Sequence, residues 1–257
     1  MNMAIGSAFF TSNTNLVMGC HITGVHDVNR NTTLADDCYD LVKDWARSIT
    51  AASVQGIIFH NNFSEATCKM FESENISFIK ITYDPQFNPN VYRYFVYRDF
   101  LQQHLQQIKR IFITDITDVV LVNNPFIDPL FIENPMALFC GDEPKVLHND
   151  WMIAHAENLR KNIPDYAAYE STFGKETLLN CGIIGGAAPL FLDFLQQLCA
   201  IHEYANRNNK TAYTGDMGVF NYLARTVFNQ QLIHGAPINT VFKQYENHRK
   251  DCWFRHK

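Results

Sequence analysis

The sequence has little positive charge and no long apolar run. Its 257 residues contain 21 Lys and Arg against 26 Asp and Glu, a formal net charge of -5. We therefore do not expect the basic face of a nucleic-acid-binding protein. No stretch reaches the roughly 18 apolar residues of a membrane-spanning helix. Residues 1–10 lack the basic start and long apolar core of a signal peptide, which favours a cytoplasmic protein.

Cysteines are few, scattered and odd in number. None of the seven lies at C-x-x-C spacing from another. This distribution fits neither a disulfide framework nor a zinc or iron–sulfur motif. We expect reduced, mostly buried thiols, as in an intracellular protein.

Several well-known catalytic motifs are also missing. The sequence has no G-x-x-x-x-G-K-[ST] phosphate loop, no G-x-G-x-x-G fingerprint and no G-x-S-x-G elbow. Kinase-like NTPases, dinucleotide-dependent dehydrogenases and α/β-hydrolases are therefore disfavoured. A hydrophobic content of 47% is enough for a sizeable core. With no linker in the sequence, we expect one domain over residues 1–257.

Strand and helix patterns alternate along the first half of the chain. The expected strands are 5–11, 54–60, 77–83, 110–115, 136–140, 178–186 and 231–233, and the expected helices are 34–50, 64–73, 91–108, 151–161, 189–205 and 216–228. This order predicts an α/β protein with a doubly wound, mainly parallel sheet and helices on both faces. Ligands of such sheets bind at the carboxyl ends of the strands.

Two aspartates lie where one of these strands should end. Asp115 and Asp118 follow the apolar run 111–113. Unpaired carboxylates at such a position would repel each other and lose hydration, so a cation is expected beside them. A divalent metal that carries a phosphorylated ligand fits best. In the alternative interpretation, one aspartate caps a turn and the other lies in solvent.

The histidines nearest the end of the sequence offer a third ligand. His256 is followed by Lys257, which combines an imidazole for a metal with a cation for a diphosphate. His234, before Gly235, offers a similar combination from a loop. Either histidine can equally be a surface residue.

Asn180 and Asp216 are the other polar candidates on predicted elements. Asn180 lies on a strand with Gly182, where glycine indicates close approach by a ligand or a packed bulge. Asp216 opens a helix, either as its cap or as a carboxylate that acts as a base or contacts a sugar. Of Arg93 and Arg98, on the helix before the aspartates, one can reach a phosphate or the acidic pair.

Together these motifs resemble a nucleotide-sugar glycosyltransferase of the GT-A class. The resemblance covers nearly the whole chain and depends on the order of the motifs. The series is Phe10-Thr11, Tyr97-Arg98-Asp99-Phe100, the aspartate pair, Asn180-x-Gly182 with Gly185-Gly186, Asp216-Met217-Gly218-x-Phe220-Asn221-Tyr222, His234-Gly235-x-Pro237 and His256-Lys257.

The resemblance implies a role for each matching residue. Asp115 and Asp118 stand where the family has its DxD motif, which holds Mn²⁺ (or Mg²⁺) against the donor diphosphate. Here two residues separate the aspartates instead of one; we favour Asp118 as the direct ligand, with Asp115 nearer the ribose or sugar. The implied metal ligands are Asp115, Asp118 and His256, with His234 as the rival histidine. The implied donor-binding residues are Phe10, Thr11, Arg98, Asp115, Asn180, Gly185, Gly186, His234 and Lys257, and the implied catalytic carboxylate is Asp216.

The resemblance also implies an activity and its partners. The enzyme would move a hexosyl or pentosyl group from a UDP- or GDP-sugar to a glycan, a lipid-linked glycan or another hydroxyl acceptor. Residues from about 1 to 125 would bind the nucleotide sugar, and residues from about 126 to 257 the acceptor. The aromatic middle, with Trp151, Tyr166, Tyr169 and Phe173, would form a sugar-binding wall. Two alternatives stay open: a sugar-nucleotide nucleotidyltransferase and a non-catalytic glycan-binding module.

Overall fold

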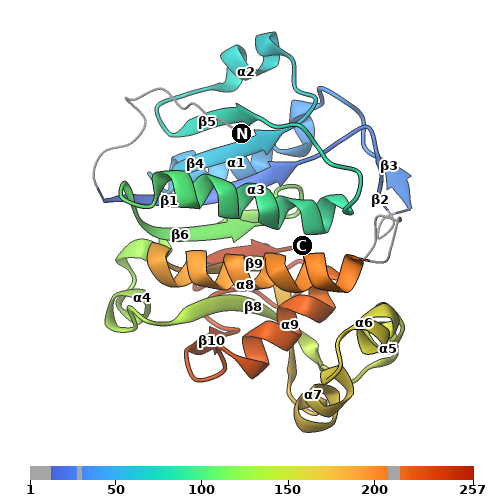
Figure 1. The fold of residues 1–257 in the computed structure, drawn as a ribbon. Coiled ribbons are helices and arrows are strands. Elements are labelled where there is room, and N and C mark those ends of the chain that lie inside the picture. The colour runs from blue at the N-terminus through green and yellow to red at the C-terminus, as the bar shows by residue number, and fades with distance from the viewer. Residues whose placement is uncertain (1–12, 28–30, 208–214) are drawn as a thin grey trace.

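The computed structural model describes residues 13–27, 31–207 and 215–257 as a sheet with helices on both faces (Figure 1). The strands are β1 (Thr14–His21), β2 (His26–Asp27), β3 (Thr32–Thr33), β4 (Gln55–His60), β5 (Ile76–Lys80), β6 (Ile108–Thr114), β7 (Val119–Leu121), β8 (Leu138–Val146), β9 (Thr177–Ala187), β10 (Leu232–His234) and β11 (Phe254–His256). The α-helices are α1 (Lys43–Ala51), α2 (Glu65–Phe71), α3 (Pro89–His104), α4 (Pro129–Glu133), α5 (Asp150–His155), α6 (Glu157–Asn162), α7 (Tyr166–Phe173), α8 (Ala188–Asn206) and α9 (Asp216–Thr226). Two 3₁₀ turns, Tyr39–Leu41 and Pro125–Ile127, precede α1 and α4.

Seven strands form the main sheet in the order β10-β8-β9-β6-β1-β4-β5. Pairing is parallel from β6 through β1 and β4 to β5, and between β10 and β8. Strand β9 is antiparallel to both of its neighbours, β6 and β8. The parallel strands therefore share one carboxyl edge, on the right in Figure 1, where the chain leaves β1 for β2 and β8 for α5.

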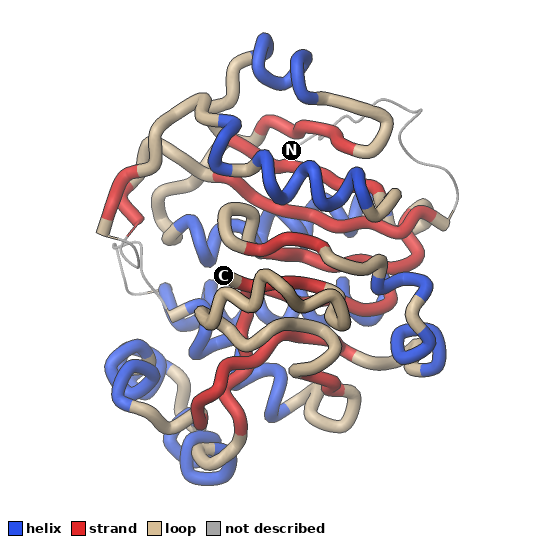
Figure 2. The backbone as a smooth tube through the Cα atoms, turned by 180° about the vertical axis from the view of Figure 1, so that it is seen from behind, coloured by secondary structure: helices blue, strands red, loops and turns tan. Residues whose placement is uncertain are grey.

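The sheet is buried on both faces. Along β1, Leu16 and Met18 belong to one core cluster and Val17 to the other, as the two-residue period of a strand requires. Helices α3, α8 and α9 cover the first face, with α3 and α8 in front of the sheet in Figure 1. Helix α1, α4 and the C-terminal segment cover the second, and from behind this segment crosses the lower half of the sheet (Figure 2).

The predicted fold class is confirmed: the protein is α/β, with a mainly parallel sheet between helices. The strand expected at 5–11 lies outside the described residues, and the first described strand, β1, was not among the expected strands. Its apolar run, 16–18, is only three residues long and flanked by Asn15 and Gly19, so periodicity gave little signal. Ser64, the first residue of the helix expected at 64–73, caps α2, because its Oγ accepts from Thr67 N at 3.1 Å.

Two other segments differ from expectation. Helix 34–50 begins only at Lys43, after a 3₁₀ turn, and Leu34 lies in a loop. Instead of one helix over 151–161, the chain forms α5 and α6 and then α7, a group of three short helices that we call the α5–α7 lobe. The lobe projects at the carboxyl edge of the sheet (Figure 1). Across the described ranges, no helix is both long and apolar enough to cross a bilayer.

Candidate metal centre

The main-chain register of the sheet fixes the position of Asp115. Strand β6 ends at Thr114, whose Oγ1 accepts a hydrogen bond of 2.7 Å from the indole of Trp45. The next residue, Asp115, donates its N–H to the carbonyl of Gly182 on β9 at 2.7 Å. These two long-range contacts therefore fix the end of β6 and, with it, the backbone of Asp115.

A second, two-stranded sheet brings His256 to the aspartates. Strand β11 pairs antiparallel with β7, and His256 lies opposite Val119, the residue after Asp118. Beyond the pair, Lys257 N donates to the carbonyl of Asp118 at 2.9 Å. The N–H of His256 donates to Thr240 Oγ1 at 3.1 Å. These backbone bonds place the imidazole beside the Asp115–Asp118 turn.

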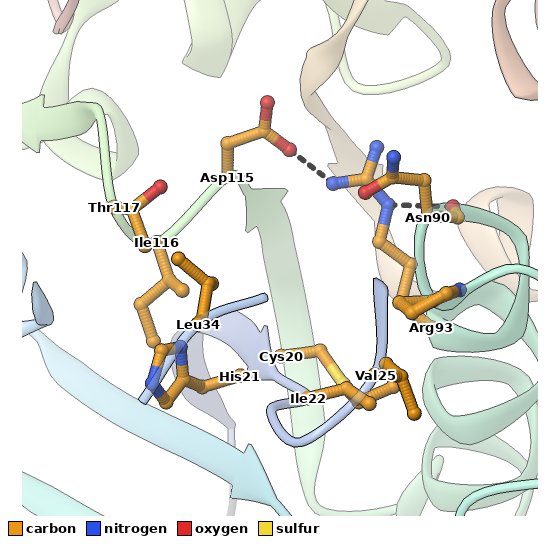
Figure 3. Close-up of a pocket in the computed structure, with 11 residues that line it drawn as sticks. Cys20, His21, Ile22, Val25, Leu34, Asn90, Arg93, Asp115, Ile116 and Thr117 are labelled. Carbon is orange, nitrogen blue, oxygen red and sulfur yellow. Dashed lines mark hydrogen bonds and ion pairs between the residues drawn. The ribbon is translucent and has the colours of Figure 1, made fainter. Parts of the chain in front are cut away.

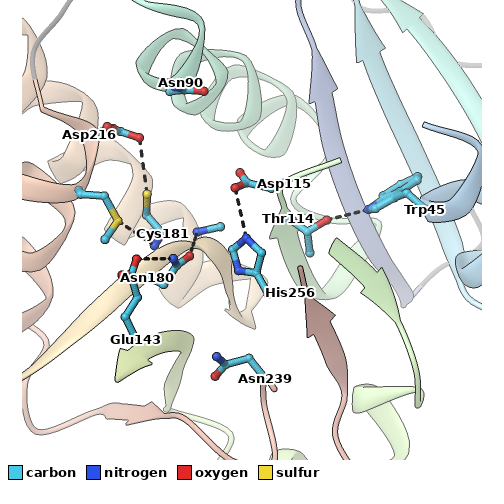
Figure 4. A network of polar contacts seen from close by, with 12 residues as sticks. Trp45, Asn90, Thr114, Asp115, Glu143, Asn180, Cys181, Asp216, Asn239 and His256 are labelled. Atoms are coloured by element: carbon cyan, nitrogen blue, oxygen red, sulfur yellow. Dashed lines mark hydrogen bonds and ion pairs between the residues drawn. The ribbon is translucent and has the colours of Figure 1, made fainter. Parts of the chain in front are cut away.

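Ligand atoms of Asp115, Asp118 and His256 all lie within 4.8 Å of one another. Figure 4 shows the imidazole of His256 directed at the Asp115 carboxylate, with Nε2 and Oδ2 3.8 Å apart. That separation is too long for a hydrogen bond. It lies within the about 4.2 Å that two atoms bound to one ion at about 2.1 Å can span.

Space and hydrogen bonding at this centre also fit a cation. Gly182 leaves it open: a Cβ there would lie 2.6 Å from His256 Cε1 and 2.7 Å from Asp115 Oδ2. His256 is 1% exposed, and its Nδ1 has no hydrogen-bond partner among the described residues. Carboxylate oxygens with one imidazole nitrogen suit Mn²⁺, and also Mg²⁺ where the ligand set is mostly oxygen.

Arg93 is the cation that the sequence could not single out. From α3 its guanidinium forms an ion pair with Asp115 Oδ1 (Figure 3). The guanidinium also donates to the carbonyl of Cys181 at 3.3 Å. Oδ2 of Asp115 is the oxygen that faces His256. The ion pair thus orients the carboxylate, with one oxygen toward Arg93 and the other toward the centre.

A recess beside Arg93 and Asp115 opens at the carboxyl edge of β1. Its lining includes Cys20, His21 and Ile22 at the end of β1, and Thr117 between the aspartates (Figure 3). Burial raises the pKa of Cys20 to about 12, so its thiol stays protonated at neutral pH. Both residues between the aspartates, Ile116 and Thr117, line the recess, and Ile116 also packs on Gly19.

Asn180, on β9, is held by two hydrogen bonds. Its Oδ1 accepts from Gly182 N at 2.7 Å, and its Nδ2 donates to Glu143 Oε1 at 2.9 Å (Figure 4). Glu143, on β8, was not among the predicted site residues. Its carboxylate sets the direction of the Asn180 amide.

Asp216 opens α9 and is 5% exposed. Its Oδ2 is 3.7 Å from Cys181 Sγ, and its Oδ1 is 3.7 Å from His155 Nε2. Burial lowers the pKa of His155, an effect that the charge of Asp216 partly offsets, so the ring is neutral at pH 7. Gly215, just before the helix, has a φ of +64°, a left-handed conformation that favours glycine.

Other predicted residues lie elsewhere in the fold or have other contacts. Gly185 packs against Phe112 and Gly186 against the carbonyl of Ala137, so close backbone packing accounts for both glycines. His234 Nδ1 is 2.9 Å from Asp142 Oδ2. It is not part of the three-residue group found among the described residues.

Arg98 and Lys257 bind carboxylates on the protein. Arg98 pairs with Asp99 at 2.8 Å and approaches Glu203 at 3.7 Å. Lys257 Nζ is 3.7 Å from Asp44 Oδ2. Phe10 and Thr11 lie outside the described residues.

Residue spacing along the chain separates Arg93 from Arg98 and Gly182 from Gly185. Arg93, Tyr97 and Phe100 follow the i, i+4, i+7 spacing of one helix face, and all three are buried. Arg93 therefore belonged to the buried face of α3 and Arg98 did not. Gly182 is two residues from Asn180, hence on the same face of the strand, whereas Gly185 is not.

No family model and no curated protein matches this sequence. Among solved structures, the chain is similar to a crystal structure of the galactosyltransferase LgtC in complex with donor and acceptor sugar analogs. The two share 14% identity with a TM-score of 0.49, over 95% of this chain and 86% of that one. At that level of similarity, residue roles rest on the chain's own geometry.

Proposed function

We propose that the protein is a metal-dependent glycosyltransferase that uses a nucleotide diphosphate sugar. The observation that carries this proposal is the convergence of Asp115, Asp118 and His256 at the carboxyl edge of a mainly parallel sheet. Ligand sites of open α/β sheets lie at this edge. The ordered series of motifs that resembles the GT-A class supports the same assignment.

Asp115, Asp118 and His256 would hold Mn²⁺ or Mg²⁺. When bound, the ion neutralises the charge that develops on the departing nucleoside diphosphate. Arg93 keeps the Asp115 carboxylate in one orientation, so little reorganisation is needed on binding. Lys257 would exchange its contact with Asp44 for a phosphate oxygen.

Asp216 is the proposed catalytic carboxylate. It would lie near the anomeric carbon, either as a base for the acceptor hydroxyl or as a polar contact to the transferred sugar. Its burial and its neutral neighbours His155 and Cys181 form a low-dielectric setting in which a charge has a large effect. Asn180, held by Glu143, would contact the sugar hydroxyls.

The chain would work as one catalytic domain. Residues up to about 125 would bind the UDP- or GDP-sugar at the ends of β1 and β6, with Phe10, Thr11 and Arg98 in the donor-binding set. Residues from about 126 onward would bind a glycan, a lipid-linked glycan or another hydroxyl acceptor. Gly185, Gly186 and His234 would support the donor site through the sheet beneath it.

The test titrates UDP, GDP and a set of UDP- and GDP-sugars in the presence of Mn²⁺ and follows the melting temperature. We expect a rise with at least one nucleotide that disappears on addition of EDTA. Release of the nucleoside diphosphate then reports turnover. No metal-dependent shift with any of these nucleotides would overturn the proposal.

Asp118→Asn is the variant that tests the role of the proposed metal ligand in turnover. Losing one such electrostatic contact typically lowers the rate by about 100-fold or more. Asp193→Asn, at an exposed carboxylate on α8, should behave as wild type. Sugar binding that survives both EDTA and Asp118→Asn would favour a glycan-binding module. Pyrophosphate release from a nucleoside triphosphate would favour a nucleotidyltransferase.

A further inference from the structure

We propose that Trp151 is the platform on which a sugar ring of the acceptor stacks, next to Asp216. This inference rests on the proposed glycosyltransferase function and adds a specificity-determining residue to it. Trp151 is 48% exposed, whereas Trp45 and Trp253 are each 1% exposed. The aromatic wall expected from the sequence reduces mainly to this ring, because Tyr166 and Tyr169 are buried in the lobe.

The indole of Trp151 is held in place by a second ring. It stacks on His155 with centroids 4.6 Å apart and an interplanar angle of 25°. His155 is 9% exposed, and burial keeps its imidazole neutral. The indole therefore has a flat, uncharged support, and a ligand that binds to it does not have to immobilise a freely rotating side chain.

The same histidine connects the platform to the proposed catalytic carboxylate. His155 Nε2 is 3.7 Å from Asp216 Oδ1. The ring of His155 also packs against Gly215, where a Cβ would lie 3.1 Å from Nε2. Trp151 and Asp216 thus contact the same imidazole, so one side chain separates the indole from the carboxylate.

Polar and packing contacts fix the α5–α7 lobe on α9, the helix that Asp216 opens. Tyr222, on α9, donates to the carboxylate of Asp165 at 2.8 and 2.9 Å. Gly218, also on α9, makes room for Leu159 and accepts from Tyr166 Oη at 3.3 Å. These contacts tie α6 and α7 of the lobe to the helix that Asp216 opens.

The chemistry of the position favours a carbohydrate. A pyranose offers an apolar C–H face to an aromatic ring and hydroxyls to nearby polar groups, and binding sites commonly combine aromatic side chains with a few such groups. Here the polar groups are Asp216 and, across the centre, Asn180 with Glu143 (Figure 4). The lobe projects at the carboxyl edge of the sheet (Figure 1), the edge where β6 ends just before Asp115.

Fluorescence tests the contact directly, because Trp151 is the exposed member of three tryptophans. The probes are lactose, maltose, cellobiose and N,N′-diacetylchitobiose, each added to protein with Mn²⁺ and UDP. We expect at least one disaccharide to protect the wild type from acrylamide quenching. Trp151→Phe should remove the part of the tryptophan fluorescence that acrylamide quenches. Protection by none of the four, or protection that persists in Trp151→Phe, would overturn the assignment.

Transfer kinetics with the protecting disaccharide supply the second readout. Trp151→Ala should raise the acceptor KM about tenfold, equivalent to about 1.4 kcal/mol, and leave the donor KM unchanged. Trp151→Phe, which keeps an aromatic face, should restore most of the affinity. Met70→Ala removes a 73% exposed side chain on α2, at the other end of the sheet, and should match wild type.

The outcomes separate this inference from the function on which it rests. If Trp151→Ala keeps both the metal-dependent melting shift with UDP and the wild-type acceptor KM, only the assignment of Trp151 is wrong. If the wild type itself shows no metal-dependent shift, the glycosyltransferase proposal fails instead.

Discussion

Gly182→Ala should weaken metal binding without removing any ligand. The new Cβ would lie 2.6 Å from His256 Cε1, 2.7 Å from Asp115 Oδ2 and 2.9 Å from Asn180 Oδ1. Ordinary contacts of this kind begin at 3.4 Å, so the imidazole must move by about 0.8 Å and the carboxylate by about 0.7 Å. Functional groups must usually stay within about 0.5 Å of their productive positions.

The size of the effect follows from misplaced ligands. Disturbing the groups that orient metal ligands typically lowers affinity by about 10- to 100-fold. At a Mn²⁺ concentration 100 times the wild-type Kd, binding stabilises the wild type by about 2.7 kcal/mol. The same concentration should stabilise Gly182→Ala by only about 0.4–1.4 kcal/mol. In a chain of this size, each kcal/mol corresponds to about 2–4 °C in melting temperature.

Gly141→Ala is the matched control. Gly141 lies on the neighbouring strand β8, and its added Cβ would meet nothing closer than 3.5 Å. Calorimetric titration with Mn²⁺ and thermal melting with and without the metal would be run on both variants and the wild type. Equal Mn²⁺ affinity for Gly182→Ala and Gly141→Ala would refute the reasoning that Gly182 keeps the centre open.

Two further predictions concern buried groups. Arg93→Gln leaves Asp115 without its ion-pair partner and should lower the free energy of unfolding by on the order of 2–3 kcal/mol in urea titrations. Arg98→Gln, at a more exposed pair, should cost less than about 1 kcal/mol, and equal losses for the two variants would contradict this account. Burial lowers the pKa of His202 from 6.5 to about 3 in the folded protein, so the stability that the neutral ring provides is complete above pH 6.5 and declines as the pH falls toward 3. Between pH 7 and pH 5, the free energy of unfolding should therefore fall by about 2 kcal/mol less in His202→Leu than in wild type. If the free energy of unfolding of the two proteins changes with pH in parallel, the burial effect is contradicted.

Much of the fold was readable from local pattern. The alternation of apolar strands and amphipathic helices predicted the α/β class, and the capping residue Ser64 marked the start of α2. Element boundaries were less well predicted, as at α1, where a 3₁₀ turn replaces the first turns of the expected helix. The short strands β7 and β11 were missed altogether. A three-residue strand carries almost no periodic signal of its own, because only its partner stabilises it.

At the site, local signals gave the candidate residues and the fold gave their pairing. Arg93 is chosen over Arg98 by the face of α3 that is buried, and Gly182 over Gly185 by the register of β9. His256 is placed beside the aspartates by β11, whereas His234 pairs with Asp142. The placement of the two histidines depends on contacts between segments far apart in the sequence, whose energies no local window contains.

The sequence by itself determined that the chain buries a large core, that it alternates strands and helices, and that two carboxylates end a buried strand. Those properties follow from side-chain chemistry and from the periods of the backbone. Only the tertiary structure decided that Asp115 and Asp118 meet His256, that Arg93 orients Asp115, and that Trp151 and Asp216 each contact His155. The physical reason is that sheet register and helix docking set the separations of side chains that are distant in sequence. A shift of under 1 Å in those separations is enough to turn a working site into polar residues that merely lie near one another.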